Sequence, residues 1–267
     1  MKGLTTVVAI LFAGGALWAQ DDPAKAAEKE AEAKAKKKIA DLNAALKKCK
    51  TEDDFVSALD GFAEEQQHPL IMAELKKYLG HGLPGVRMEA ADELGKFKKD
   101  EKAAKALLDS AKRDRVVDCA RQCLKEVGDI GFRGVARDLV GFFAHKELDL
   151  CKEAVESSGA LKSKDSIDPL IALVTELEVE KEKQNNSGGQ QNPGGGGNPG
   201  GVGGGLPGGG GGGQQSADDE KKKRADELLP KAIQALKDIT GEKFNTSKEW
   251  KKWWQKNKQF FKELEDK

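Results

Sequence analysis

A helix-length pattern of apolar residues recurs along this chain and limits the folds open to it. From residue 69, apolar residues return every three or four positions in stretches of about a dozen residues, and short loops with Gly or Asp separate the stretches. This spacing puts the apolar residues on one face of an α-helix, and no stretch alternates as a half-buried strand does. We therefore expect an all-α fold. Its helices are predicted to begin near Pro69, Pro84, Glu101, Asp114, Gly131, Glu147 and Asp165.

The predicted helices repeat in pairs. Three first helices share apolar or small residues at a starting position, four residues on and eight residues on. These sets are Val86, Ala90 and Leu94; Val116, Ala120 and Leu124; and Leu150, Ala154 and Ser158. A second helix follows each set, with Leu107, Leu139 or Leu173 on it. The starting positions lie 30 and 34 residues apart, a period typical of α-solenoids, in which stacked helix pairs bury a continuous core.

Two segments carry a resemblance to a known family. "VRMEAADELGKF" (86–97) resembles the first helix of HEAT repeats, and "SIDPLIALVTELE" (166–178) is similar to the second helix. The likeness covers roughly residues 69–180, and its short period is closest to the HEAT-like repeats of phycobilisome lyases. It implies a short right-handed α-solenoid over residues 51–183. The lyase activity is not carried over.

A glycine-rich segment interrupts the predicted solenoid. Residues 184–217 contain 17 of the 31 glycines and no charged residue, and they include "NPGGGGNPGGVGGGLPGGGGGG". Pro-Gly runs can neither bury surface nor hold a helix, so this segment is predicted to be a disordered linker. It is either a tether between domains or an insertion in one loop of the solenoid. We expect no binding role for it.

Residues 218–267 are predicted to form a terminal repeat. Leu228 starts a fourth set with Ala232 and Leu236 at the same steps, and Trp250 lies 22 residues after it, where the other repeats place a leucine. A last repeat has no successor, so it closes the core with a large apolar face. The expected structural cap consists of Trp250, Trp253, Trp254, Phe260 and Phe261. The ending "ALKDITGEKFNTSKEWKKWWQKN" resembles that of exported bacterial HEAT-repeat proteins.

The same aromatic and basic segment has two other interpretations. A helix with lysines on one side and Trp or Phe on the other suits a membrane interface, although Glu249 and Glu263 dilute its positive charge. Stacking on nucleic-acid bases is disfavoured, because the chain has 45 basic and 45 acidic residues and no net field that attracts phosphates. We expect a protein partner, with a membrane surface as the alternative and no nucleic acid.

The N-terminal segment is predicted to direct export. Lys2 precedes an apolar run from Leu4 to Leu17, and Ala19 stands just before acidic residues. This is the pattern of a signal peptide over residues 1–19 with cleavage near Ala19, whereas an uncleaved anchor fits less well because the run is short. We expect a periplasmic or secreted protein. Its mature form would open with a charged Ala/Glu/Lys-rich helix over residues 20–50.

No pattern of catalytic, metal-binding or cofactor-binding residues occurs. The cysteines are interpreted as small buried apolar side chains, although an oxidising space permits disulfides. They are Cys49, Cys119, Cys123 and Cys151. The three histidines are scattered, and no pair has zinc-ligand spacing. No nucleophile elbow or phosphate-binding loop is present. We expect no enzyme activity, no metal and no cofactor.

The remaining expectation is recognition of a partner. On the predicted helix 131–144, the apolar residues are expected to face inward, which leaves Arg133 and Arg137 together on the outer face. Arginine suits interface hydrogen bonds, so these two residues are the candidate partner-binding pair. The sequence thus predicts an exported, non-catalytic HEAT-repeat scaffold for protein–protein interaction. The identity of the partner and the oligomeric state stay open.

Overall fold

The described part of the chain is entirely helical. The structure is a computed structural model that describes residues 23–64, 67–187 and 212–261. These residues form eleven α-helices and two short 3-10 helices, with no strand among them, so the predicted all-α class is confirmed. The helices are α1 (Pro23–Leu46), α2 (Glu52–Leu59), α3 (Pro69–Tyr78), α4 (Pro84–Gly95), α5 (Glu101–Arg113), α6 (Val117–Ile130), η1 (Arg133–Val135), α7 (Ala136–Val140), α8 (Leu148–Leu161), η2 (Lys164–Ser166), α9 (Ile167–Ser187), α10 (Gly212–Thr240) and α11 (Ser247–Asn257).

Two predicted segments lie wholly or partly outside the described residues. The signal peptide, residues 1–19, precedes the first described residue. Most of the predicted linker 184–217 is also outside, but its two edges are described and are helical. Helix α9 continues to Ser187 and α10 begins at Gly212. Both helices therefore extend into the range predicted for the linker.

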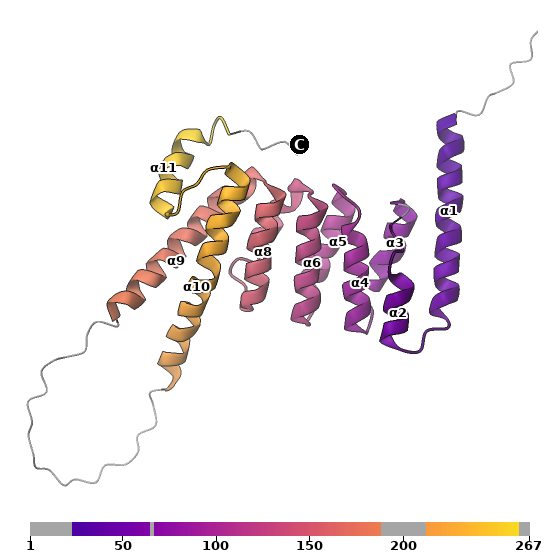
Figure 1. Cartoon of the computed structure of the whole chain (residues 1–267), viewed down its shortest axis with the longest axis horizontal. Helices are drawn as coiled ribbons and strands as arrows, with labels where there is room; N and C mark the ends of the chain where they lie inside the picture. Colours follow the sequence, from indigo (N-terminus) through magenta and orange to yellow (C-terminus); the bar gives the residue numbers. More distant parts are fainter. Residues whose placement is uncertain (1–22, 65–66, 188–211, 262–267) are drawn as a thin grey trace, which may run out of the picture.

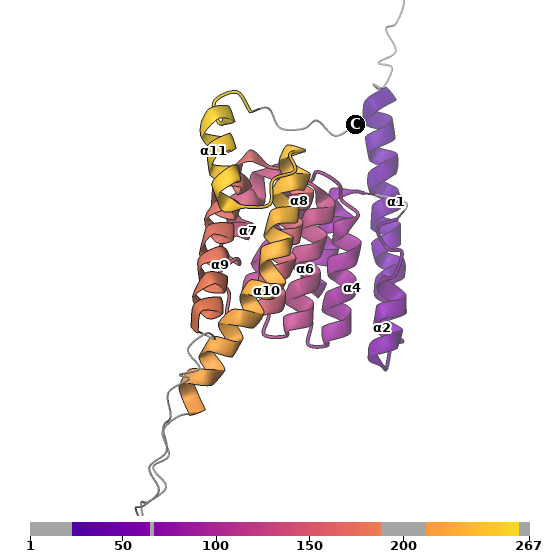
Figure 2. The same ribbon diagram turned by 60° about the vertical axis from the view of Figure 1, so that its left-hand side comes forward.

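The helices pack in two layers. Figure 1 shows α2, α4, α6, α8 and α10 side by side in one row, with α3, α5 and α9 behind it. The turned view in Figure 2 shows α9 and α11 on one side of this row and α1 and α2 at its far end. Each front helix contacts the next one in the row, and α11 packs on α9. One cluster of buried apolar side chains runs from Ala35 to Trp254.

Local signals set several helix ends as expected. The Thr51 side chain accepts a hydrogen bond from the Asp54 amide, and the Asp54 carboxylate accepts one from the Thr51 amide, which completes the capping box of α2. At the end of α10, Gly241 has φ of +76° and its amide donates to the Lys237 carbonyl oxygen at 2.8 Å. This left-handed conformation favours glycine, so Gly241 ends the helix.

The sequence alignment of the second repeat is wrong by three residues. Its predicted starting residue, Val116, is the N-cap of α6 and is 37% exposed. Counting from the helix starts, Cys119 occupies the place of Val86, and Cys123 occupies the place of Ala90. Both cysteines are buried and free, as is Cys151. These three side chains therefore have the predicted role of small apolar core residues, whereas Cys49 is only partly buried.

Close contacts between successive front helices depend on one glycine per helix. A Cβ atom at Gly128 of α6 would lie 3.0 Å from the Ser157 Cα of α8, and one at Gly159 would lie 3.0 Å from the Ala235 Cα of α10. At Gly95 of α4 the added atom would collide with the Glu126 carboxylate of α6. Since nothing larger than hydrogen fits at Gly128 and Gly159 without moving a backbone, these glycines set the spacing of the row.

The matching position of α10 holds a larger residue. Gly159 lies nine residues after Leu150, and nine residues after Leu228 the chain has Lys237. Its ammonium group donates to the Asn245 side chain at 2.8 Å. In the described residues no further front helix follows α10, and a long side chain is accommodated at this position.

Helix α10 belongs to the same packed body as the helices before residue 188. Leu228, Ala232 and Leu236 are fully buried in the shared core. Polar contacts add to this packing, because the Arg224 guanidinium donates to the Phe143 carbonyl oxygen at 2.6 Å and Lys152 pairs with Glu227 at 2.7 Å. The residues after the glycine-rich segment thus complete the row that α2 begins.

Two buried glutamates lie at equivalent places in α4 and α6. The Glu93 carboxylate accepts hydrogen bonds from the Gly61 and Ala63 amides at 2.8 and 2.6 Å and from Lys96 at 2.6 Å. It ties the turn after α2 to α4. The Glu126 carboxylate accepts from Gln122 at 2.9 Å and Lys125 at 3.1 Å, with no backbone amide among these donors. Burial raises the pKa of Glu126 to about 7.

Because the pKa of Glu126 is raised, the free energy of unfolding is expected to decrease as the pH rises. The native state binds more protons than the unfolded state between the ordinary carboxyl pKa of 4.5 and about 7, so stability falls as pH rises through that window. We expect Glu126→Gln to be more stable relative to wild type at pH ~8.5 than at pH ~5.5, as measured by thermal unfolding. Glu30→Gln is the control, because the hydrogen bond from Lys34 lowers the pKa of Glu30 and keeps it out of this window. An equal difference at both pH values for Glu126→Gln would contradict the prediction.

Candidate functional site

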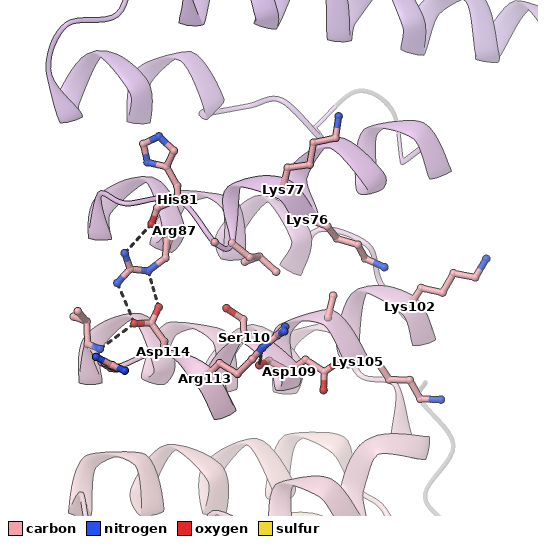
Figure 3. A pocket seen from close by; sticks show the side chains of 15 residues that line it. Lys76, Lys77, His81, Arg87, Lys102, Lys105, Asp109, Ser110, Arg113 and Asp114 are labelled. Carbon is pink, nitrogen blue, oxygen red and sulfur yellow. Dashed lines mark hydrogen bonds and ion pairs between the residues drawn. The ribbon is translucent and has the colours of Figure 1, made fainter.

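One hollow on the described surface is a basic groove. It lies between α3 and α5, has a volume of about 890 Å³, and is shown in Figure 3. Its lining includes Lys76 and Lys77 from α3, Lys102 and Lys105 from α5, and three arginines. The arginines are Arg87, Arg113 and Arg115. The only acidic side chains in the lining are Asp109 and Asp114. We call this feature the α3–α5 groove.

The two helices present these charges because their other faces are in the core. Leu75 of α3 is fully buried, as is Leu107 of α5. Lys76 follows Leu75 directly, and Lys102 and Lys105 lie three residues apart on the opposite face of α5 from Leu107. The Asp100 side chain accepts a hydrogen bond from the Ala103 amide at 2.8 Å and so fixes the start of α5.

An ion pair lies at one end of the α3–α5 groove. The Arg87 guanidinium donates to both carboxylate oxygens of Asp114, at 2.6 and 3.0 Å, and to the His81 carbonyl oxygen at 2.9 Å (Figure 3). Only 13% of the Arg87 side chain and 6% of the Asp114 side chain are exposed. The hydrogen bonds to Asp114 raise the pKa of Arg87. Arg87 thus joins α4 to the C-cap residue of α5 and to the turn before α4, so the ion pair is a structural contact.

Other basic side chains of the groove are also paired. Lys77 pairs with Glu74 at 2.6 Å, and Lys105 pairs with Glu101. The Arg113 Nε donates to the Asp109 carbonyl oxygen at 2.9 Å. These contacts hold the side chains on their own helices and neutralise two of the lysines.

Three cations and one carboxylate remain open to a ligand. Among the described residues, no ion pair or hydrogen bond is made by the side chains of Lys76, Lys102 or Arg115. The Asp109 carboxylate, exposed on α5, has none either. In Figure 3, Lys76 and Lys102 extend from facing helices toward the same end of the groove. The groove therefore offers charges that the described contacts do not use.

The predicted partner-binding arginines lie elsewhere and bind neighbouring turns. The expected helix 131–144 is broken into η1 and α7. The Arg133 Nε donates to the Leu161 carbonyl oxygen at 3.2 Å. Arg137 pairs with Asp165 at 3.0 Å, and its side chain is 81% exposed. Each arginine thus contacts the segment of chain that begins at the end of α8, and Arg137 keeps most of its surface in solvent.

The aromatic residues predicted as a cap differ in how deeply they are buried. Trp250 and Trp254 are buried in the shared core, whereas Trp253 and Phe261 are partly buried and pack against it. The Trp254 indole Nε1 donates to Asp168 at 2.6 Å, and the Trp253 indole Nε1 donates to Glu242 at 3.1 Å. Phe260 is 79% exposed, because it follows the end of α11, so its inclusion in the cap is wrong.

A smaller hollow brings one predicted arginine together with one predicted tryptophan. Arg137, Asp168, Trp254 and Lys258 border a space of about 350 Å³ between α7, α9 and α11. Lys258 pairs with Asp168 at 2.6 Å, and Arg137 pairs with Asp165. Arg137, Asp165, Asp168 and Lys258 are therefore all in ion pairs, whereas Lys76 and Lys102 of the α3–α5 groove are in none.

Three carboxylates lie close together at the start of the front row. Oxygens of Asp60, Glu89 and Glu93 come within 4.8 Å of one another. Burial, with the nearby acidic groups, raises the pKa of Glu89 to about 7. The Glu93 carboxylate is already engaged by two amides and Lys96. Its hydrogen bonds give it a structural role in holding the turn after α2.

Two comparisons with known proteins give no match. The search against family models finds none for this chain, and the search of curated proteins finds none either. Within the described residues, no helix combines the length and the apolar character that crossing a bilayer requires.

Proposed function

We propose that this chain is an exported, non-catalytic α-solenoid of HEAT-like repeats that binds another protein along its second helices. The repeat period of the sequence, the two helical layers and the glycine contacts between front helices support the solenoid. The signal-peptide pattern of residues 1–19 supports export. The observation that carries binding is the α3–α5 groove, where Lys76, Lys102 and Arg115 have no partner of their own.

The alternative of membrane docking receives less support from the aromatic residues. A membrane-bound helix inserts its Trp and Phe side chains into the lipid interface. In α11 the Trp250 and Trp254 side chains are buried in the protein core, and beside this helix only Phe260 is largely exposed among the predicted cap residues. A protein partner at the groove is therefore the better-supported function.

Site-specific crosslinking tests this proposal. A photoreactive amino acid at Ala106, which lines the groove, is compared with one at Arg121, which is exposed on the front helix α6. The mature chain, residues 20–267, is incubated with an envelope and culture-fluid extract of the source cells. We expect a protein adduct from position 106 that is absent from position 121 and is identified by mass spectrometry. Equal labelling from both positions, or a bound cofactor in the purified protein, would contradict the proposal.

A further inference from the structure

We propose that the α3–α5 groove receives an extended, acidic segment of a partner polypeptide. This inference rests on the proposed function and adds the chemistry of the partner. The first argument is charge. Lys77 and Lys105 are neutralised by Glu74 and Glu101, and Arg87 is neutralised by Asp114. Lys76, Lys102 and Arg115 are left without an ion pair or hydrogen bond, and Arg113 donates only to a backbone carbonyl oxygen, so the lining carries an excess of positive charge. Complementary negative charge on a partner would steer it to this place.

The second argument is the presence of an unpaired acceptor among the cations. The Asp109 carboxylate is exposed in the lining and makes no ion pair or hydrogen bond in the described structure. A polypeptide carries backbone N–H donors that this carboxylate can accept, as well as acidic side chains for the cations. A phosphodiester backbone has no such donor, and its charges are repelled by Asp109 and Asp114. The mixed lining therefore favours a polypeptide over a nucleic acid or a phosphate-bearing surface.

The third argument is length. Helix α5 has 13 residues and spans about 20 Å at about 1.5 Å per residue. Lys102 lies in its first turn, beside Lys76 of α3, and Arg115 lies just beyond its last turn. An extended segment rises about 3.3 Å per residue, so roughly six residues would span this distance. Acidic side chains roughly five or six positions apart would meet a cation at each end of the groove.

A binding assay with a defined probe tests the inference. The probe is a fluorescent peptide of twelve residues, rich in Glu with Gly and Ser between, and binding to residues 20–267 is followed by fluorescence anisotropy. We expect saturable binding that weakens with salt. In the triple variant Lys76→Glu, Lys102→Glu, Arg115→Glu we expect binding to weaken by about tenfold or more, because each lost contact becomes a repulsion.

The matched control makes the same change of net charge away from the groove. Lys222→Glu, Lys243→Glu, Lys248→Glu replaces three exposed lysines for which the described structure gives no ion pair or hydrogen bond. This variant is expected to bind the peptide within about twofold of wild type, since distant exposed charges are screened. Thermal unfolding checks that both variants are folded. We expect both to be folded, because none of the six side chains has a described ion pair or hydrogen bond to lose.

Three outcomes would overturn the inference. They are equal loss of peptide binding in both triple variants, unchanged binding in the groove variant, and tighter groove-dependent binding of a twelve-nucleotide thymidylate or of anionic phospholipid vesicles. Crosslinking from position 106 distinguishes a failure of the acidic-segment inference from a failure of the proposed protein binding. A specific protein adduct that persists in the groove variant rejects only the acidic segment, whereas the absence of any specific adduct rejects protein binding at the groove.

Discussion

Replacement of Trp250 by alanine is expected to lower the free energy of unfolding by about 4 kcal/mol, because the truncation leaves a large cavity in the core. The Trp250 side chain is fully buried and meets Phe244 edge-on, with ring centroids 5.1 Å apart, and Trp253 with centroids 6.0 Å apart. Its indole N–H has no hydrogen-bond partner among the described residues, so the loss is one of packing. Denaturant unfolding followed by tryptophan fluorescence and circular dichroism measures it.

The control for this prediction is Phe260→Ala. Phe260 is 79% exposed, so its removal should change stability by less than about 0.5 kcal/mol. Vesicle co-sedimentation then separates packing from membrane docking. If α11 closes the core, Trp250→Ala destabilises the protein and leaves vesicle binding absent in both forms. A stable Trp250→Ala variant that loses salt-sensitive vesicle binding would instead favour membrane docking.

The second large effect is expected at the contact between α6 and α8. Gly128→Val should destabilise the protein by about 3 kcal/mol, because a Cβ atom there lies 3.0 Å from the Ser157 Cα and valine adds two further methyl groups. A side chain that meets backbone atoms cannot be accommodated by a rotamer change, so the two helices must separate. The free energy of unfolding from urea titration, together with the m-value, reports this change.

Gly82→Val is the matched control for the contact. Gly82 is exposed, and a Cβ atom added to it has no neighbour within 4 Å. The substitution should alter stability by less than about 1 kcal/mol. If Gly82→Val and Gly128→Val were equally destabilising, the effect would come from replacing any glycine by valine. The close approach of α6 and α8 would then not be its cause.

Local patterns in the sequence predict the helices well and their alignment less well. The starts at Pro69, Pro84 and Glu101 are those observed. Helix α6 begins at Val117 in place of Asp114, because the Asp114 carboxylate binds Arg87 and the Val116 amide before the helix begins. Short side-chain contacts of this kind depend on residues 27 positions away, which periodicity cannot detect.

The three-residue error in the second repeat has a similar origin. Val116, Ala120 and Leu124 satisfy the same spacing as Cys119, Cys123 and Val127, because both sets follow helical steps of four. Cysteine counts as only a weak apolar signal when it is read in sequence. What decides the alignment is the approach of Gly128 to Ser157, a tertiary contact between helices 29 residues apart in sequence.

The candidate site could not be predicted for a different reason. Lys76 and Lys102 are 26 residues apart, and they become neighbours only because α3 and α5 lie in the same layer. The equal totals of 45 basic and 45 acidic residues hide a local excess of positive charge. One signal was available in the sequence. Helices α3 and α5 each carry a pair of lysines on a polar face, Lys76 with Lys77 and Lys102 with Lys105. The glutamates of the same helices neutralise only one lysine of each pair.

Lys237 has a consequence for the size of the array. Helices α4, α6 and α8 each place a glycine against the helix that follows, and such a surface accepts a closely packed neighbour. The last helix offers a charged, four-carbon side chain held toward Asn245. A helix packed there as α8 packs on α6 would meet the volume of this side chain and would have to desolvate its ammonium group, so close stacking is less favourable at α10 than at the earlier glycines.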